Sequence, residues 1–330
     1  MDKMKILVVG GAGYVGSHTC KALANSGYEP VTFDNMSAGH DWAVQWGPLE
    51  RGNLLDRDRI IEVVETHQPA AAMHFASLIN VGDSVRKPGK YWHNNVMGSI
   101  NLMEALVSAG VENFVFSSTC AVYAPTDALS LDEELPYGPI NAYGKTKRAI
   151  EMLIDDFEKA YGIRAAILRY FNASGADADA VIGEAHDPET HLIPLALSAA
   201  AGNRGRLKIF GNDYDTPDGT CIRDYIHVSD LAEAHVLSLR HLFDGAPTTA
   251  INLGSGKGYS VREVIDCIER ILGKNVPADN APRREGDPAR LVANIDRARS
   301  VLGWEPRRSN LEKIVSDAWR WHRQHFNYQP

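Results

Sequence analysis

The chain has 330 residues, of which 44% are hydrophobic and 23% charged, as is typical of soluble globular enzymes with one or two domains. The formal net charge of −8 argues against nucleic acid or an anionic membrane as the main partner. Four widely spaced cysteines without a Cys-x-x-Cys pair predict free thiols in a reducing cytoplasm. We expect neither a signal peptide nor a membrane span, because a strand starts near the N-terminus and no apolar run is long enough.

A short apolar run from Lys5 to Gly10 predicts a buried parallel strand. Gly10, Gly13 and Gly16 follow a G-x-x-G-x-x-G pattern, and a helix is expected from Val15 to about Ser26. Glycines allow a tight turn and close approach of the backbone, and the helix N-terminus then faces a pyrophosphate. The turn therefore predicts a dinucleotide site.

The next predicted strand, residues 30–34, ends in Asp34, 18 residues after Gly16. A carboxylate at this place should meet the ribose hydroxyls of an adenosine, although an acid at a strand end can also have no ligand. No Lys or Arg occurs from Asn35 to Glu50, so nothing nearby would neutralise a 2′-phosphate. The predicted cofactor is therefore NAD rather than NADP.

Further apolar strands are expected at residues 70–75, 113–117 and 163–168, with a long helix at 91–109. This alternation predicts an α/β fold with a doubly wound parallel sheet, whose ligand lies at the carboxyl ends of the strands. The strand at 113–117 runs directly into Thr119, which places that hydroxyl at the same edge. It could bond a substrate oxygen or only the local backbone.

Tyr143 and Lys147 are four residues apart at the start of a predicted helix, so both side chains should lie on one face. An ammonium about 4 Å from the phenol would favour the phenolate by about 4 kcal/mol at an effective dielectric of about 20. That would lower the pKa of the tyrosine by about three units and make it a usable base. The spacing alone also fits an ordinary surface pair.

The pattern changes after Asn172, where residues 173–189 are rich in Gly, Asp and Pro and predict an irregular segment. Helices are then expected at 191–201, 229–241, 260–272 and 310–325, and strands at 207–210 and 250–253. We predict an NAD-binding domain at 1–172 and a smaller mixed α/β substrate domain at 173–330, with about 229–253 returning to the first. His186, His191 and His227 are too scattered in sequence to predict a metal site.

Anion binding is the predicted chemistry of the C-terminal half. Arg223 and Arg284 fall in expected loops, and a guanidinium matches a phosphate with two parallel hydrogen bonds. Two of them suit a nucleoside diphosphate, although either one alone could be a surface ion pair. Asp287 could receive a ribose hydroxyl, and Asn172 could contact a phosphate or sugar oxygen.

The glycine turn, Asp34, the Ser118–Thr119 strand end and Tyr143-x-x-x-Lys147 resemble the extended short-chain dehydrogenase/reductase family. More specific stretches resemble its UDP-glucose 4-epimerase (UDP-galactose 4-epimerase) branch: His74–Ala76, Asn94–Val96, Leu168–Asn172, Phe210–Tyr214, Asp218–Thr220, Arg223–Val228 and Arg283–Asp287. The likeness runs from Lys5 to about His322.

The resemblance implies roles for individual residues. The tyrosine is the acid and base, the lysine holds both it and the nicotinamide ribose, and the hydroxyl contacts the sugar; these roles fall on Tyr143, Lys147 and Thr119. Implied cofactor contacts are Gly10, Gly13, Tyr14, Val15, Gly16, Asp34, Asn35, Asn53, Leu54, Phe75, Ala76, Asn94, Ser117, Tyr143, Lys147 and Tyr170. Implied substrate contacts are Thr119, Tyr143, Asn172, His191, Leu192, Lys208, Phe210, Arg223, Arg284, Asp287 and Leu291.

Two positions depart from the family pattern. Asn53 replaces an acid, and Ile79 replaces a lysine that often follows His-Phe-Ala-Gly-Leu in relatives. The first change keeps a hydrogen bond to the adenine with less charge, and the second removes a cofactor contact. Both leave the tightness of NAD binding open.

The implied reaction is the interconversion of UDP-glucose and UDP-galactose through a transient 4-keto sugar, with tightly bound NAD taking and returning the C4 hydride. Relatives that divert this intermediate place an acid beside the active-site hydroxyl, whereas Cys120 and Ala121 follow Thr119 here. Open alternatives are C4 epimerisation of another UDP-sugar, such as a pentose or N-acetylhexosamine, a nucleotide-sugar reductase or dehydrogenase, and a non-catalytic sensor. The resemblance also implies a homodimer that associates through helices of the nucleotide domain.

Overall fold

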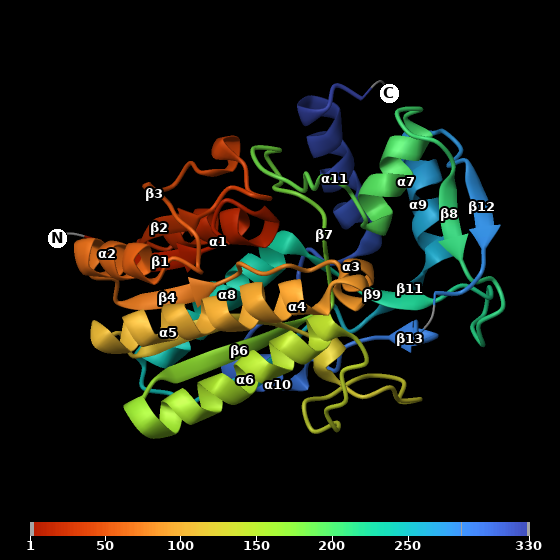
Figure 1. Cartoon of the computed structure of the whole chain (residues 1–330). Coiled ribbons are helices and arrows are strands. Elements are labelled where there is room, and N and C mark those ends of the chain that lie inside the picture. Colours follow the sequence, from red (N-terminus) through yellow and green to blue (C-terminus); the bar gives the residue numbers. More distant parts are fainter. Residues whose placement is uncertain (1–2, 285, 329–330) are drawn as a thin grey trace.

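The computed structural model describes residues 3–284 and 286–328. Within these residues, seven strands form one parallel sheet in the order β10–β6–β5–β4–β1–β2–β3 (Figure 1). Their bounds are β1 Lys5–Val9, β2 Glu29–Asp34, β3 Leu49–Arg51, β4 Ala71–His74, β5 Asn113–Thr119, β6 Arg164–Tyr170 and β10 Thr249–Leu253. The predicted doubly wound sheet is confirmed. The sequence did not predict β3, a short edge strand with two charged residues.

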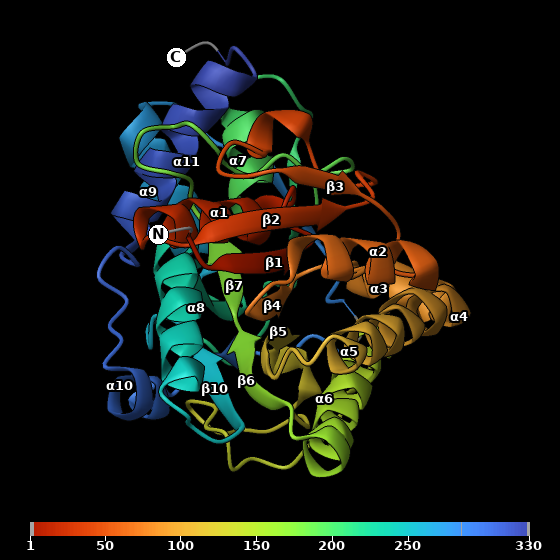
Figure 2. The same cartoon turned by 90° about the vertical axis from the view of Figure 1, so that its left-hand side faces the viewer.

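Helices cover both faces of this sheet (Figure 2). On one side lie α1 (Tyr14–Asn25), α8 (Val228–Phe243) and α10 (Asp296–Leu302), and on the other α2 (Arg57–His67), α5 (Gly98–Ser108) and α6 (Ala142–Tyr161). Within β1, Ile6 and Val8 pack into the first core while Leu7 and Val9 pack into the second. Because successive side chains point to opposite faces, burial on both faces requires an uninterrupted apolar run.

The long helix predicted at 91–109 is confirmed, and it contains a π-helical turn near its start. The chain forms α3 (Val81–Arg86), α4 (Pro88–Tyr91), a π-helical turn (Trp92–Met97) and then α5. Asn95 lies in the π turn, where it accepts from the Leu78 N–H at 2.8 Å and donates to the Thr146 hydroxyl at 3.2 Å. This side chain ties the segment after β4 to the start of α6, and π turns often occur at such functional places.

The C-terminal domain is smaller and mixed. Here β9 (Ile222–His227) pairs in parallel with β7 (Asn172–Ser174) and β13 (Arg290–Leu291) and antiparallel with β11 (Gly258–Ser260), while β8 (Leu207–Phe210) pairs with β12 (Ala278–Ala281). Its own core is built by α7 (Leu192–Ala200), α9 (Val261–Leu272) and α11 (Leu311–His325). The segment predicted as irregular therefore begins with a strand, β7. None of the helices in the described residues is long and apolar enough to span a membrane.

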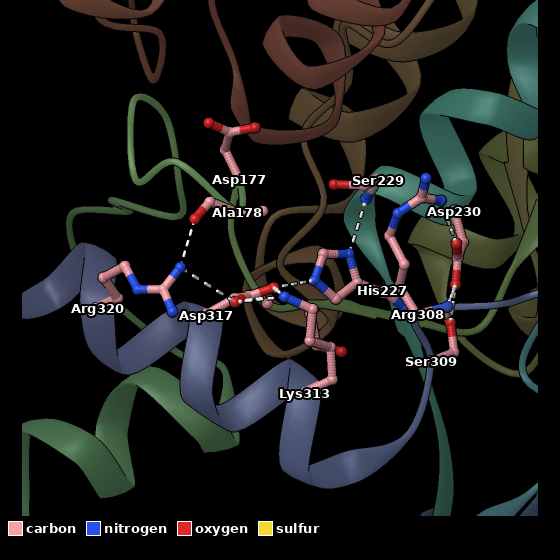
Figure 3. A network of polar contacts seen from close by, with 12 residues as sticks. Asp177, Ala178, His227, Ser229, Asp230, Arg308, Ser309, Lys313, Asp317 and Arg320 are labelled. Atoms are coloured by element: carbon pink, nitrogen blue, oxygen red, sulfur yellow. Dashed lines mark hydrogen bonds and ion pairs between the residues drawn. The ribbon is translucent and has the colours of Figure 1, made fainter.

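A buried polar network anchors α11 to the end of β9 (Figure 3). His227 accepts from the Ser229 N–H at 3.1 Å through Nδ1, and its Nε2 lies 3.1 Å from Asp317 of α11. The Ser309 hydroxyl donates to Asp230 at 2.6 Å and accepts from the His227 N–H at 2.9 Å. His227 is therefore a structural residue that joins α11 to the start of α8.

Candidate active site

The glycine turn lies where the strand order reverses, at the carboxyl ends of β1 and β4. Gly10 has a φ of +83°, and a Cβ there would lie 2.6 Å from the Ala76 nitrogen. A Cβ on Gly16 would lie 2.2 Å from the Gly10 carbonyl oxygen. Gly13 is the N-cap of α1 and offers no side chain that could bond the first N–H groups. The turn is therefore closely packed against the neighbouring backbone, and the first N–H groups of α1 remain available for an anion.

Asp34 ends β2 directly beside this turn. Its carboxylate accepts from the Ala12 N–H at 3.1 Å and from the Met36 N–H at 2.9 Å. Burial raises the pKa of Asp34, and these hydrogen bonds partly oppose that shift. The neighbouring Asn35 is exposed and caps the following turn. The predicted ribose acceptor is thus held rigidly at the sheet edge.

The residues after β3 and β4 complete this half of the site. Asn53 is exposed and accepts from the Leu55 N–H at 3.0 Å, while Leu54 is buried. The N–H groups of Phe75 and Ala76 both donate to the Val9 carbonyl, at 2.7 and 3.1 Å, which holds the chain against the glycine turn.

His235 of α8 is a residue that the sequence analysis missed. Its ring lies 4.8 Å from that of Phe75, and its Nε2 contacts the hydroxyl of Tyr170 at the end of β6. Burial lowers the pKa of His235 to about 4, so the imidazole is neutral. A histidine inside an amphipathic helix gives no signal in the sequence that it supports two residues of a site.

Thr119 and Tyr143 meet at the carboxyl end of β5. The Thr119 hydroxyl accepts from the Ala121 N–H at 3.2 Å, and Thr119 is near enough to the phenol to favour a lower pKa of Tyr143. Gly144 permits this approach, since a Cβ there would lie 2.4 Å from the Ala121 carbonyl oxygen. Asn141 caps α6 by accepting from the Gly144 N–H at 2.9 Å. Local capping and one glycine therefore bring the helix to the sheet edge.

Lys147 lies one turn further along α6, as predicted, but its ammonium has another partner. Nζ donates to the Ser117 carbonyl at 2.7 Å and stands 4.9 Å from the Phe116 ring centre. Burial lowers the pKa of Lys147 to about 7, and Glu151 partly opposes this shift. Burial raises the pKa of Tyr143 to about 12. The expected lowering of the phenol pKa by Lys147 is therefore absent from this structure, because burial raises that pKa and the ammonium is directed to the Ser117 carbonyl.

A buried ion pair behind Lys147 was also missed. Glu151 of α6 accepts from Arg169 of β6 at 3.0 and 2.9 Å and from the Ser118 hydroxyl at 2.6 Å. Both charged side chains are only 1% exposed. The pair fixes α6 to the strand end that carries Thr119. An acid within the apolar stripe of α6 and an arginine within an apolar strand were available signals.

The predicted phosphate-binding residues gather on the C-terminal domain. Arg223 lies in β9 rather than in the predicted loop, opposite Leu291 of β13, and its guanidinium donates to Asp287 at 2.5 Å. The guanidinium of Arg284 lies 4.1 Å from the Phe210 ring centre. The structure thus brings Arg223 next to Asp287 and Phe210 next to Arg284, although the members of each pair are far apart in the sequence.

The remaining predicted substrate contacts lie on other elements of the C-terminal domain. Asn172, the first residue of β7, donates to the Asp224 carbonyl at 2.9 Å. His191 is the N-cap of α7, and Leu192 is its first residue. Lys208 is exposed in β8, opposite Asp279 of β12.

A glycine turn at the switch point, with a Thr-Tyr pair and a lysine at the same sheet edge, defines an enzyme of the short-chain dehydrogenase/reductase class. The profile of the NAD dependent epimerase/dehydratase family matches residues 6–254, and the chain belongs to this family. The family predicted from the sequence is confirmed, and so is NAD as the cofactor.

Relatives agree over nearly the whole chain. A UDP-glucose 4-epimerase from Rhizobium meliloti is 52% identical over 98% of both chains. The crystal structure of UDP-glucose 4-epimerase from Brucella ovis in complex with NAD is 48% identical, with a TM-score of 0.94 over 96% of this chain and 98% of that one. The enzyme from Bifidobacterium longum, in complex with NAD+ and UDP, is 32% identical with a TM-score of 0.92, covering 99% and 100%.

Proposed function

We propose that the protein interconverts UDP-glucose and UDP-galactose by epimerisation at C4, with NAD as its cofactor. The observation that carries this proposal is that Thr119 at the end of β5 and Tyr143 and Lys147 of α6 lie at the same carboxyl edge of the sheet as the glycine turn. The relatives at 52% and 48% identity support the choice of reaction.

The cradle around the glycine turn fits NAD, because Gly10 and Gly16 have no room for a Cβ and α1 begins with N–H groups directed at a pyrophosphate. Asp34 would bind the adenosine ribose, and the other contacts implied by the resemblance lie along the same edge. When bound, NAD supplies a hydride acceptor and donor for C4 and a positive charge beside the phenol.

The chain itself moves the proton. Tyr143 takes the proton from the C4 hydroxyl and later returns it on the other face of the sugar. Thr119, at the end of β5 against the start of α6, orients that proton. Lys147 binds the cofactor ribose and holds Ser117, and Glu151 with Arg169 keeps α6 in register with β5.

The substrate is held at its nucleotide end. Arg223 and Arg284 bind the diphosphate, Phe210 offers its ring to the uracil, and Asp287 accepts a ribose hydroxyl through an oxygen not used by Arg223. Asn172, His191, Leu192, Lys208 and Leu291 surround these groups. Anchoring only this end leaves the 4-keto hexose free to turn between hydride removal and return.

Epimerisation is favoured over elimination because the two residues that follow Thr119 in the chain, Cys120 and Ala121, are not acids. The next residue, Cys120, is partly buried, and desolvation raises the pKa of its thiol to about 12 and keeps it protonated. Leu291 adjoins Arg223 and would crowd an N-acetyl group, which favours a plain hexose.

We further propose that two chains associate through the helices around residues 91–109 and 146–160. Trp92, Met97 and Met152 support this, because they are 42%, 44% and 55% exposed on these helices. Large apolar side chains of this kind mark contact surfaces when they gather.

The direct test is incubation with UDP-galactose without added reductant. Appearance of UDP-glucose is expected, whereas net NADH release would indicate a dehydrogenase and inertness toward every UDP-hexose a sensor. Tyr143→Phe should retain UDP binding and lose at least about a hundredfold in turnover, the contribution of a general base. Near-normal turnover of this variant would remove Tyr143 from its role.

A further inference from the structure

The loop between β7 and α7 gathers four side chains around one point. Glu184, His186, Glu189 and His191 each present one carboxylate oxygen or ring nitrogen, and these four atoms all lie within 4.8 Å of one another. The sequence predicted that His186 and His191 are too scattered for a metal site, and the fold nevertheless brings their ring nitrogens together. Turns in the loop, rather than helical or strand spacing, bring them together.

The geometry is close to that of a four-coordinate ion. His186 Nδ1 lies 3.1 Å from Glu184 Oε1 and 3.7 Å from Glu189 Oε1, and His191 Nδ1 contacts the same Glu184 oxygen. The N–H groups of Thr190 and His191 hold the Glu189 carboxylate at 2.7 and 2.8 Å. Ligands about 2.0–2.2 Å from a tetrahedral zinc ion are about 3.3–3.6 Å apart. The four atoms, which lie within 4.8 Å of one another, would shift relative to one another by about 1 Å to reach that arrangement.

A metal ion would replace the two imidazoles as the partner of the buried carboxylate. Glu184 is only 3% exposed, and a buried carboxylate needs compensation. Across residues 3–284 and 286–328, the ion pairs of Glu184 and Glu189 involve His186 and His191 and no lysine or arginine. One divalent ion would neutralise both carboxylates and leave the imidazoles neutral.

We propose that Glu184, His186, Glu189 and His191 bind one divalent transition-metal ion, with zinc as the best fit. Imidazole and carboxylate ligands suit zinc, and four protein ligands leave no open position, so the site is structural. All four come from eight consecutive residues, so the ion fixes the loop directly before Leu192, where α7 begins.

The fixed loop is part of the contact between the two halves of the molecule. The His186 ring meets the Tyr14 ring edge-on at 6.2 Å, and the Ala185 carbonyl contacts His40 Nε2 at 2.7 Å. The ion would therefore hold the start of α7 against the glycine-turn helix. This site stands whatever reaction the enzyme performs.

The test uses the purified full-length chain, stripped with a chelator and dialysed against Zn²⁺. Elemental analysis should find about one zinc per chain, and Co²⁺ in its place should give the visible absorption of a tetrahedral site. At zinc concentrations a hundred times the Kd, the Tm of the 330-residue chain should rise by about 4 °C, if it unfolds as one unit. Failure to retain zinc, with no change in Tm, would overturn the proposal and leave two glutamate–histidine ion pairs.

Variants locate the ion. His186→Ala and Glu189→Gln, both at partly exposed positions, should each weaken zinc binding by at least about a hundredfold, the upper range for losing even an outer partner. His93→Ala is the matched control, because His93 is exposed on the π turn, which packs against α5 and α6. Undiminished zinc binding by both cluster variants would place the ion elsewhere and refute the assignment.

Discussion

The buried Glu151–Arg169 pair offers a sharp test of how the site is held. Glu151→Gln keeps the shape of the side chain but removes its charge, and it sets an amide NH2 where one of the two Arg169 donors now bonds a carboxylate oxygen. Arg169 is 1% exposed, so its charge would lose its buried counter-ion. Breaking a buried pair in this way costs about 3–5 kcal/mol. At about 0.7 kcal/mol/K for a chain of this length, the Tm should fall by about 4–7 °C.

Denaturant unfolding followed by circular dichroism measures this loss. Asp156→Asn, at an exposed position of the same helix, is the control and should change stability by less than about 0.5 kcal/mol. Replacing both members, as in Glu151→Gln with Arg169→Met, should recover part of the loss, because no buried charge is then uncompensated. A loss below about 1 kcal/mol for Glu151→Gln alone would mean that the Arg169 charge is hydrated, and the reasoning would fail.

Three further changes probe the cofactor, the buried lysine and the diphosphate. Gly16→Ala should weaken NAD binding at least tenfold in titration calorimetry, because its Cβ would lie 2.2 Å from a backbone oxygen, while Gly89→Ala, with no neighbour within 4 Å, should not. The pKa of Lys147 is about 7 when folded and about 10.4 when unfolded, so the unfolded chain binds more protons between these values and stability rises with pH. Between pH 6 and 9, the free energy of unfolding of Lys147→Met should rise by about 3 kcal/mol less than that of the unaltered protein. The same pH dependence of the unfolding free energy in both proteins would contradict the shifted pKa. Arg284→Ala should weaken UDP binding about 10- to 100-fold, the worth of a charge-assisted hydrogen bond, whereas Arg283→Ala, whose guanidinium pairs with an exposed aspartate, should not; equal affinities would misplace the diphosphate.

Sequence patterns that extend over a few residues predicted most of the central sheet. The apolar run of β1, the glycines after it and Asp34 at the end of β2 are local features, and the sheet forms from them as predicted. The spacing of Tyr143 and Lys147 likewise fixed their place on α6. The sequence did not predict short polar strands such as β3 or the π turn at Asn95, because each depends on partners elsewhere in the chain.

What the amino-acid order determined by itself is most of the central parallel sheet and which residues stand at the ends of its strands. Tertiary structure alone decided the partners of the charged groups. Lys147 turns to the Ser117 carbonyl, Arg223 lies in a strand against Asp287, and His186 joins His191 in one cluster. The physical reason is that periodicity depends on neighbours within a few residues, whereas burial and charge pairing depend on whatever the folded chain brings near.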